Sequence, residues 1–397
     1  MSDLWIEVDL DAIKHNYQQV VSGLSEGCSV MAVVKADAYG LGAAEVARAL
    51  QEEGCLAYAV TTITEALALR SQQIRGQILV LGPSSPEDWP AAIEADIEIT
   101  VSQLDWISVM NKLAAKCGKQ AKVHIKIETG MGRTGFADGQ LQELAARLTA
   151  ASSLHVRGAY THFARGAQRD KAYTQIQHER FIDAVKKLEA LGILIPEKHV
   201  CNSAAYFDFP QYHYDYVRVG TLIIGHYPTP AFAGKLRLRD PWLAKTRIVH
   251  VQKAPKATYV GYQSLYKTKK ETTLAVIPAG YADGFGIEPK LVPQNVIDLI
   301  KIIIKNTAAL IGIQLGKEKL MLGGRTVTVA GKIGMQLTVL DVGEVPCQLG
   351  DEMIIPLRRT QANPRIMRIY IKEGLYYKAR SLSEEFLALN TVGNKEI

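Results

Sequence analysis

One lysine stands where its amine could do covalent chemistry. Lys35 ends the apolar segment Val30–Lys35 and opens Lys-Ala-Asp-Ala-Tyr-Gly. An isolated lysine in such a position usually extends its ammonium to solvent. At the carboxyl end of a barrel strand it would instead face a ligand site, where a partly desolvated amine can form a Schiff base. Tyr39 could contact a ligand in the same mouth or pack as the first residue of a helix.

Small residues that suit a phosphate follow two later apolar segments. Ser203 comes directly after Lys198–Asn202, and Gly220 and Thr221 come directly after Tyr216–Val219. In barrels, the loops after the last two strands frequently bind phosphate through backbone N–H groups. Each short motif alone is common in loops, but both at these positions together favour a phosphate site.

Arg218 lies two residues before Gly220, at the end of the last apolar segment. A surface ion pair is the ordinary interpretation. The alternative is a partner for the nitrogen of a pyridine ring in the barrel mouth. Because arginine does not readily accept a proton, that nitrogen would stay unprotonated. The ring would then be a weaker electron sink, which suits plain proton transfer.

Two further segments offer site residues. In Lys126–Arg133, two glycines flank a methionine and permit close approach of a ligand, so Arg133 could bind a carboxylate; a simple tight loop is the equal alternative. His162 ends the segment Val156–His162. A lone histidine is more often a packing residue, but here we expect it over a ring or bonded to Arg218.

These residues need a scaffold, and the chain predicts a (β/α)8 barrel. Helical stretches such as Ala43–Gly54 and Leu141–Ala151 alternate with short β-branched runs. An open doubly wound sheet would offer a Gly-rich phosphate loop after its first strand, where this chain has Lys35. The eight predicted strands are Val30–Lys35, Ala57–Thr61, Gln77–Leu81, Ile97–Val101, Lys122–Glu128, Val156–His162, Lys198–Asn202 and Tyr216–Val219.

After about residue 230 the pattern changes to short β segments separated by Gly and Pro turns. We therefore predict a barrel domain over 1–230 and a mainly β domain over 231–397, with residues 1–10 able to pair with either. Val296–Leu315, inside an insertion near 290–320, is expected to be a surface helix. The predicted β segments are Ala244–Gln252, Thr273–Ile277, Thr326–Val329, Thr338–Val342 and Arg365–Ile371.

Composition excludes several classes of protein. The net charge is only +6, and the densest basic cluster, Lys267, Lys269 and Lys270, lacks the interleaved aromatics of a nucleic-acid surface. Five scattered cysteines without a CxxC pair argue against a disulfide framework or a structural zinc site. The first residues do not resemble a signal peptide, and Val296–Leu315 carries too many polar residues to cross a membrane. We expect a cytoplasmic protein that binds neither membrane nor nucleic acid.

Taken together, the motifs resemble those of the alanine racemases, from about Trp5 to Tyr370. The order and spacing of the motifs also agree. The shared motifs are Val-Val-Lys-Ala-Asp-Ala-Tyr-Gly, Thr-Gly-Met-Gly-Arg-Thr-Gly, Tyr-Thr-His-Phe-Ala, Asn-Ser-Ala, Val-Arg-Val-Gly and Gly-Tyr-Ala-Asp-Gly.

The resemblance implies a homodimer that interconverts L- and D-alanine with pyridoxal 5′-phosphate (PLP), supplying D-alanine for cell-wall peptidoglycan. Lys35 would carry PLP as a Schiff base and act as one base. Tyr262, from the other subunit, would be the second. Arg218 would face the ring nitrogen, and Tyr39, Ser203, Gly220 and Thr221 would hold the phosphate. The resemblance also implies substrate contacts from Arg133, Met335 and Tyr281, and a carbamylated Lys126.

The chain departs from the family pattern at several positions. Leu41 stands where most members have histidine, Gln336 replaces an aspartate, and about two dozen residues are inserted before Met335. Three alternatives therefore stay open: a racemase of another small amino acid such as serine, a PLP-dependent decarboxylase, and an inactive PLP-binding paralogue. A decarboxylase would be expected to place an acid, not Arg218, at the ring nitrogen.

Overall fold

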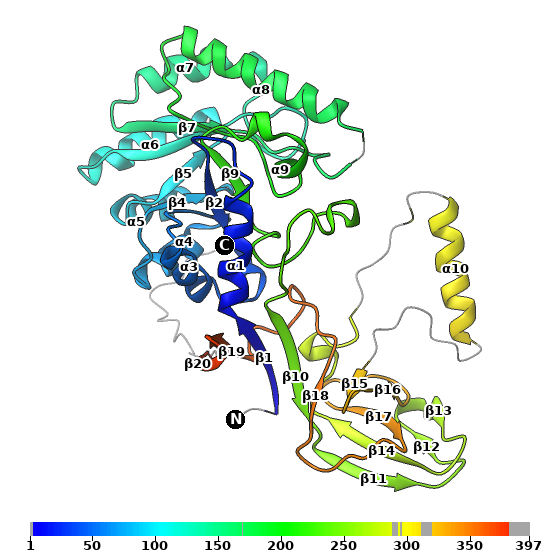
Figure 1. Ribbon diagram of the computed structural model, residues 1–397. Helices are drawn as coiled ribbons and strands as arrows, with labels where there is room; N and C mark the ends of the chain where they lie inside the picture. The colour runs from blue at the N-terminus through cyan, green and yellow to red at the C-terminus, as the bar shows by residue number, and fades with distance from the viewer. Residues whose placement is uncertain (1–2, 169, 288–292, 294–295, 311–319, 381–397) are drawn as a thin grey trace, which may run out of the picture. The chain divides into compact units, whose positions relative to one another are not determined.

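The computed structural model describes residues 3–168, 170–287, 293, 296–310 and 320–380. Its backbone divides into two compact units. One comprises Asp9–Pro241 with Ile371–Gly374, and the other comprises Met1–Val8, Trp242–Tyr370 and Leu375–Ile397. The first residues thus belong with the C-terminal unit. Figure 1 labels the elements of each unit.

The first unit contains a sheet of eight parallel strands in the order β8-β7-β6-β5-β4-β3-β2-β9. Backbone hydrogen bonds from Asp215 to Lys198 and from Arg218 to Cys201 join β9 to the β8 edge, so the barrel is nearly closed. Each strand matches a predicted one to within a few residues. The strands are β2 (Ser29–Val33), β3 (Ala57–Val60), β4 (Gln77–Val80), β5 (Glu98–Val101), β6 (Ala121–Lys126), β7 (Leu154–Tyr160), β8 (Glu197–His199) and β9 (Tyr216–Val219).

Helices separate successive strands, as expected for a (β/α)8 barrel. α1 precedes the first barrel strand and packs beside the segment that follows β9, where the side-chain amide of Asn16 bonds to the backbone of Ile223 and Arg239. The helices are α1 (Leu10–Val21), α2 (Lys35–Tyr39), α3 (Ala43–Glu52), α4 (Ile63–Ser71), α5 (Trp89–Glu94), α6 (Leu104–Lys116), α7 (Leu141–Thr149), α8 (Ala172–Ala190) and α9 (Ala205–Asp208).

The barrel interior has two chemically different halves. Small and medium apolar side chains from β2, β3 and β4, among them Met31, Ala59 and Leu79, form a dry cluster. From β5 to β9 the interior instead carries charged and aromatic side chains, including buried His124, Lys126 and Arg218. Since buried polar groups need partners, this second half has to be organised by hydrogen bonds.

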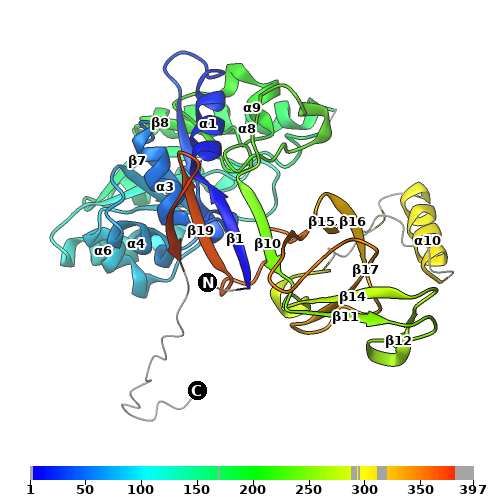
Figure 2. The same cartoon turned by 60° about the horizontal axis from the view of Figure 1, so that its bottom comes forward.

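The second unit is built on a ten-stranded sheet. β1 (Leu4–Asp9) pairs antiparallel with β10 (Trp242–Arg247), and β19 (Met367–Lys372) lies on its other side (Figure 2). The remaining strands are β11 (His250–Ala254), β14 (Thr272–Ile277), β15 (Leu320–Leu322), β16 (Arg325–Val329), β17 (Thr338–Gly343), β18 (Glu352–Ile354) and β20 (Leu375–Arg380). A separate hairpin joins β12 (Tyr259–Val260) to β13 (Tyr266–Lys267).

The C-terminal predictions were only partly right. The predicted segment Ala244–Gln252 is two strands, β10 and β11, which are separated by a break at Ile248 and Val249 and lie apart in the sheet order. The short strands β12, β13, β15, β18 and β20 had no periodic pattern long enough to reveal them. The predicted helix Val296–Leu315 is confirmed as α10 (Val296–Leu310), while 311–315 lie outside the described residues.

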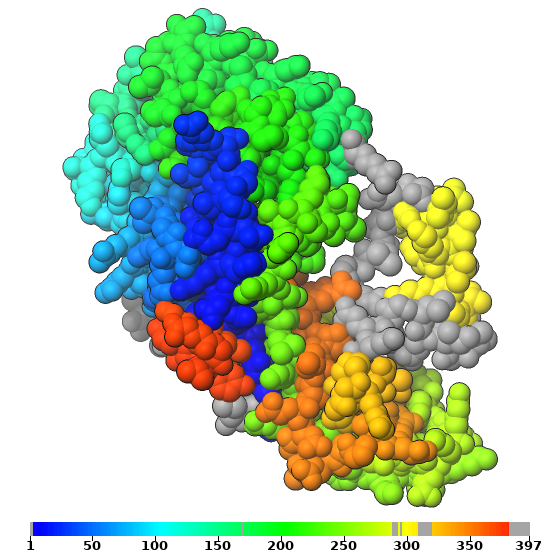
Figure 3. Space-filling view, in the orientation of Figure 1, coloured from blue at the N-terminus to red at the C-terminus, as the bar shows by residue number. Residues whose placement is uncertain are grey.

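α10 exposes several large apolar side chains, among them Ile297, Ile300 and Ile304. The helix is the yellow segment of the space-filling view (Figure 3). Within the described part of the chain, no helix is both long enough and apolar enough to span a bilayer.

Candidate active site

A cavity of about 510 Å³ lies where the carboxyl ends of the barrel strands meet. This volume is within the range of sites for small molecules and cofactors. The cavity brings together nine of the residues singled out in the sequence, which come from five different segments of the barrel unit. They are Lys35, Tyr39, Lys126, Arg133, His162, Ser203, Arg218, Gly220 and Thr221.

The lysine segment differs from its prediction in an informative way. β2 ends at Val33, and Lys35 begins a turn in which Ala36, Asp37, Ala38 and Tyr39 all have φ between 50° and 58°. The backbone N–H of Ala38 donates to the carbonyl of Val34 at 2.8 Å, and that of Gly40 donates to Ala36 at 3.0 Å. α2 is therefore a left-handed helical turn, a conformation that costs L-residues about 1–2 kcal/mol each.

Two carboxylates tether this turn. Glu65, in the capping box of α4, accepts from the backbone N–H of Ala36 at 2.6 Å. Asp37 accepts from the N–H of Ala43 at 2.8 Å, at the start of α3. The neighbouring helices thus stabilise the strained backbone that starts at Lys35. Strain held in place by its surroundings is typical of functional sites.

Tyr39 and Gly220 lie in close contact across the cavity. A Cβ added to Gly220 would stand 2.3 Å from the phenol oxygen of Tyr39, so only glycine fits. The backbone N–H of Gly220 donates to Ser203 Oγ at 3.2 Å. Burial raises the pKa of Tyr39 to about 12, so its hydroxyl stays protonated and can donate. This cluster of small groups and donors matches a phosphate cradle.

Arg218 is 3% exposed and has no carboxylate among its hydrogen-bond partners in the described residues. Nη1 bonds to the Nδ1 and carbonyl of His199, and Nη2 donates to the carbonyl of Thr161 at 2.6 Å. The guanidinium also lies over the ring of Tyr160, 5.1 Å from its centroid. Burial lowers the pKa of Arg218 to about 10, which still leaves it charged at neutral pH.

Lys126 is buried at the end of β6, and its amine donates to Thr134 Oγ1 at 2.6 Å. Burial and the charges of Arg133 and Arg218 lower the pKa of Lys126 to about 8. The same surroundings, burial first and then Arg218 and Arg133, lower the pKa of His162 to about 3. His162 is therefore a neutral group on the cavity wall.

Sequence reasoning missed several residues of the cavity wall. Tyr160 and Thr134 lie inside the quoted motifs but were given no role. The two-residue spacing of β strands could have indicated Tyr160, because it lies on the inward face of β7, next to Lys126 on β6. Most of the remaining wall comes from residues with no distinctive side-chain chemistry, among them Val33 of β2 and the loop residues Thr61, Leu81, Gly82, Pro83, Ala204 and Pro228.

The three remaining predicted site residues belong to the other unit. Tyr262 lies in a turn after β12 and is 74% exposed. Tyr281 and Met335 are also exposed, and they are joined locally because the N–H groups of Tyr281 and Ala282 donate to the carbonyls of Gly334 and Met335. The structure therefore places these side chains on the surface of the second unit.

The cavity combines four cationic side chains, Lys35, Lys126, Arg133 and Arg218, with no carboxylate among the described residues that line it. Lys126 and Arg218 are buried, and burial of charge without an opposite charge is costly, so the site favours anionic ligands. A barrel with such a cationic mouth and a following β domain fits an enzyme whose ligand is anionic and binds beside a lysine.

Comparison with known proteins gives the family. Residues 8–228 match the model of the alanine racemase N-terminal domain, and residues 243–370 match that of its C-terminal domain. The chain belongs to the alanine racemase family, whose members are isomerases. The sequence-based resemblance is thereby confirmed.

Individual relatives agree along most of the chain. It is 35% identical to alanine racemase 2 of Caldanaerobacter subterraneus subsp. tengcongensis, covering 88% of this chain and 84% of the relative. It is 39% identical to an alanine racemase of Methanococcus maripaludis over 71% of this chain and 76% of the relative. The solved alanine racemase of Clostridium difficile 630 superposes with a TM-score of 0.84 at 29% identity, over 96% of this chain and 99% of that one.

The contact between Gly220 and Tyr39 generates a prediction. Gly220→Ala should displace Tyr39 from the cradle and weaken the binding of PLP, the cofactor that the sequence resemblance implies, since overpacking costs about 1–3 kcal/mol, or roughly 5–150-fold in affinity. Titration of the apo-protein with PLP measures this. Gly139→Ala is the control, because a Cβ there meets nothing within 4 Å. Equal affinity in the Gly220 and Gly139 variants would contradict the cradle.

Proposed function

We propose that this protein is a PLP-dependent enzyme that interconverts L- and D-alanine by a two-base mechanism and supplies D-alanine for peptidoglycan. The proposal rests on one observation. The same cavity is lined by Lys35, by the cradle around Gly220, and by the cations Lys126, Arg133 and Arg218. The racemase names of the relatives support the reaction.

The residues present fit the cofactor. Tyr39, Ser203, Gly220 and Thr221 would hold its phosphate, and Lys35 would bind it covalently. Arg218 would meet the ring nitrogen. When bound, PLP supplies an electron-poor ring that acidifies the Cα–H of an attached amino acid. Acceptor groups hold Arg218 in place, and Arg218 can only donate hydrogen bonds, so the ring nitrogen would remain unprotonated. An unprotonated ring withdraws fewer electrons, but enough for proton transfer at Cα.

The protein's own groups would then move the proton. We propose that Lys35 exchanges a proton on one face of the substrate Cα and Tyr262 of a second copy does so on the other, in a homodimer. Two bases on opposite faces are required to invert a centre, and each must come within hydrogen-bond reach of the Cα–H. Arg133, with Tyr281 and Met335 of the second copy, would seat the substrate carboxylate.

Two solved relatives support an amino-acid site. One is the Clostridium difficile 630 enzyme in complex with cycloserine, and another is the Bacillus anthracis enzyme with bound L-Ala-P. Alanine is accordingly the proposed substrate, and serine is the second candidate. Circular dichroism of L-alanine and of L-serine incubated with protein and PLP decides between them. If neither L-alanine nor L-serine loses its optical activity, the protein would be an inactive paralogue.

The first prediction concerns the lysine. Reduction of the PLP-loaded protein with borohydride should fix the cofactor on Lys35, because this amine lies in the cavity at the start of the left-handed turn. Peptide mapping by mass spectrometry locates the label. Label on Lys126, the other lysine of the described cavity wall, would contradict the assignment.

The second prediction concerns the exposed tyrosine. Tyr262→Phe should lose on the order of a hundredfold to ten-thousandfold in racemisation rate, because removing a general base typically has that effect. PLP affinity should be retained. Tyr259→Phe, an exposed tyrosine on neighbouring β12, is the matched control. Near-normal turnover of the Tyr262 variant in both directions would exclude the two-base assignment.

We further propose that Lys126 is carbamylated and thereby positions Arg133. Only the neutral amine reacts with carbon dioxide, and a pKa of about 8 leaves roughly one lysine in ten neutral at pH 7, against roughly one in 2,500 for an ordinary lysine. The carbamate would also add the negative charge that this cationic cavity lacks.

Carbon-13 NMR with labelled bicarbonate tests this modification. A carbamate signal should appear and should grow as the pH rises towards and through 8, because the neutral fraction increases. Lys126→Met should abolish the signal. A signal that persists in this variant, or no signal in the parent protein at pH 8, would refute the modification.

A further inference from the structure

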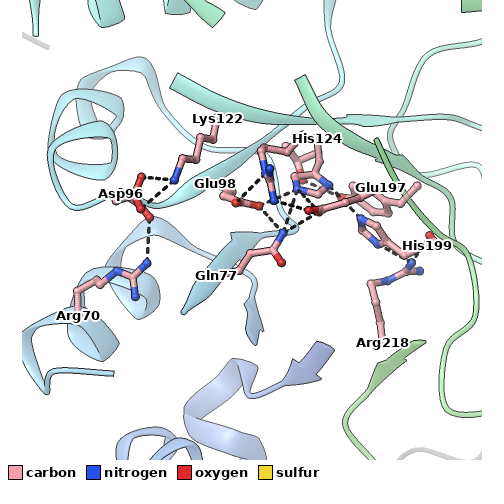
Figure 4. Close-up of polar contacts among 12 residues, drawn as sticks. Arg70, Gln77, Asp96, Glu98, Lys122, His124, Glu197, His199 and Arg218 are labelled. Atoms are coloured by element: carbon pink, nitrogen blue, oxygen red, sulfur yellow. Dashed lines mark hydrogen bonds and ion pairs between the residues drawn. The ribbon is translucent and has the colours of Figure 1, made fainter. Parts of the chain in front are cut away.

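A chain of hydrogen bonds runs through the barrel interior away from the cavity, and we call these four residues, Arg218, His199, His124 and Glu98, the barrel relay (Figure 4). Arg218 Nη1 lies 3.0 Å from His199 Nδ1. His199 Nε2 lies 3.0 Å from His124 Nδ1, and His124 Nε2 lies 2.7 Å from a carboxylate oxygen of Glu98. All four side chains are at most 5% exposed.

The hydrogen-bond chemistry gives the relay a single direction. Arginine has only donors, so His199 Nδ1 must accept and the proton of this imidazole sits on Nε2. That proton is donated to His124 Nδ1, which must also be an acceptor. The remaining proton of His124 is therefore on Nε2 and is donated to the carboxylate of Glu98. Both imidazoles are neutral, each in one tautomer.

Burial favours the neutral form of His199 in this arrangement. Desolvation and the nearby charge of Arg218 hold the pKa of His199 well below its usual value. Burial alone would disfavour the anion of Glu98, but hydrogen bonds from His124 and Gln77 and the charge of Arg157 keep its pKa below the usual value. The relay thus joins a buried cation to a buried anion through two neutral rings.

A bulge shapes the carboxylate end of the relay. Val123 and His124 are consecutive on β6, but their partners on β7 are Val156 and Gly158. Arg157 is therefore the extra, bulged residue. Bulges re-aim side chains. Arg157 consequently reaches Glu98, at 3.7 Å, and also contacts Glu197, while Gln77 donates to both carboxylates at 2.6 and 3.1 Å.

Glu98, His124 and Glu197 are also residue types that bind metals. Here the donors of Gln77 and Arg157 already satisfy carboxylate oxygens, and the guanidinium supplies the positive charge that a metal ion would bring. The cluster is therefore better explained as the anionic end of the relay.

We propose that Glu98, His124 and His199 are positioning residues that fix the orientation of Arg218 towards the ring nitrogen of the cofactor. This inference rests on the proposed function for the identity of the ring, but the relay itself is a property of the chain. Glu98 acts by accepting from His124, which sets the tautomer of His124 and, through it, that of His199. His199 then offers Arg218 an acceptor and not a competing N–H.

Glu98→Gln tests the proposal, and Glu197→Gln is its matched control. Both changes remove one carboxylate that contacts Gln77 and Arg157, but Glu197 is only partly buried, lies 3.9 Å from His124 and is outside the relay. A glutamine at 98 offers one acceptor where several donors converge. If the amide N–H₂ of this glutamine turns towards His124, Nε2 of His124 has to accept. Both imidazoles would then carry their proton on Nδ1, and the Nδ1–H of His199 would face Arg218.

The first readout is nitrogen-15 NMR of the histidine rings in the apo-protein at pH 7. The parent protein and Glu197→Gln should show His124 and His199 protonated only on Nε2. Glu98→Gln should show Nδ1 protonation in one or both rings. If the parent protein shows Nδ1–H on either ring, or a doubly protonated ring, the relay is refuted, whether or not any variant folds.

The second readout is racemisation kinetics of the PLP-loaded proteins. Glu98→Gln should lower kcat roughly 10–100-fold, the effect typical of residues that orient a contacting group, with little change in KM for alanine. Glu197→Gln should lose far less. Equal kcat values in the two variants would overturn the positioning role. If the parent protein racemises neither amino acid, the proposed function fails, while the NMR result still decides the relay.

Discussion

Positive charge gathered in one cavity, with Lys126 and Arg218 buried, is the constraint on which the rest of the structure depends. Four cations meet at the barrel mouth, and the described cavity wall offers them no carboxylate. The protein tolerates this because carbonyl oxygens, an imidazole and an aromatic face solvate Arg218, and a hydroxyl solvates Lys126. Because no protein carboxylate neutralises these charges in the described cavity wall, the folded barrel itself favours the binding of anions.

The lysine that begins the left-handed turn shows how the scaffold supports this chemistry. In a regular right-handed α-helix, Ala36–Tyr39 would have a backbone free energy lower by several kcal/mol. Glu65 and Asp37 anchor the strained turn to two helices, so the position of Lys35 is determined by parts of the barrel that do not touch the ligand. The same logic applies to Gly220, whose missing side chain admits Tyr39.

Sequence reasoning found the barrel and its cations because both leave local patterns. Each strand is a short apolar run, and Lys35, Arg218 and the Gly-Thr pair follow such runs directly. The left-handed turn could not be predicted, since Ala36 and Ala38 favour ordinary helix and only long-range tethers reverse them. The relay was missed for a related reason: His124, His199 and Glu98 lie far apart in sequence and meet only when the barrel closes.

Strand β1 has a consequence for biosynthesis. Leu4, Trp5 and Ile6 are synthesised well before their sheet partners, β10 and β19, whose residues come more than two hundred positions later. Throughout translation of the barrel, this apolar strand has no native partner, and an unpaired strand is a site for aggregation. The need for chaperones in cells should therefore increase with the time between the synthesis of β1 and that of β10 and β19. A circular permutant that joins β19 directly to β1 would shorten this time.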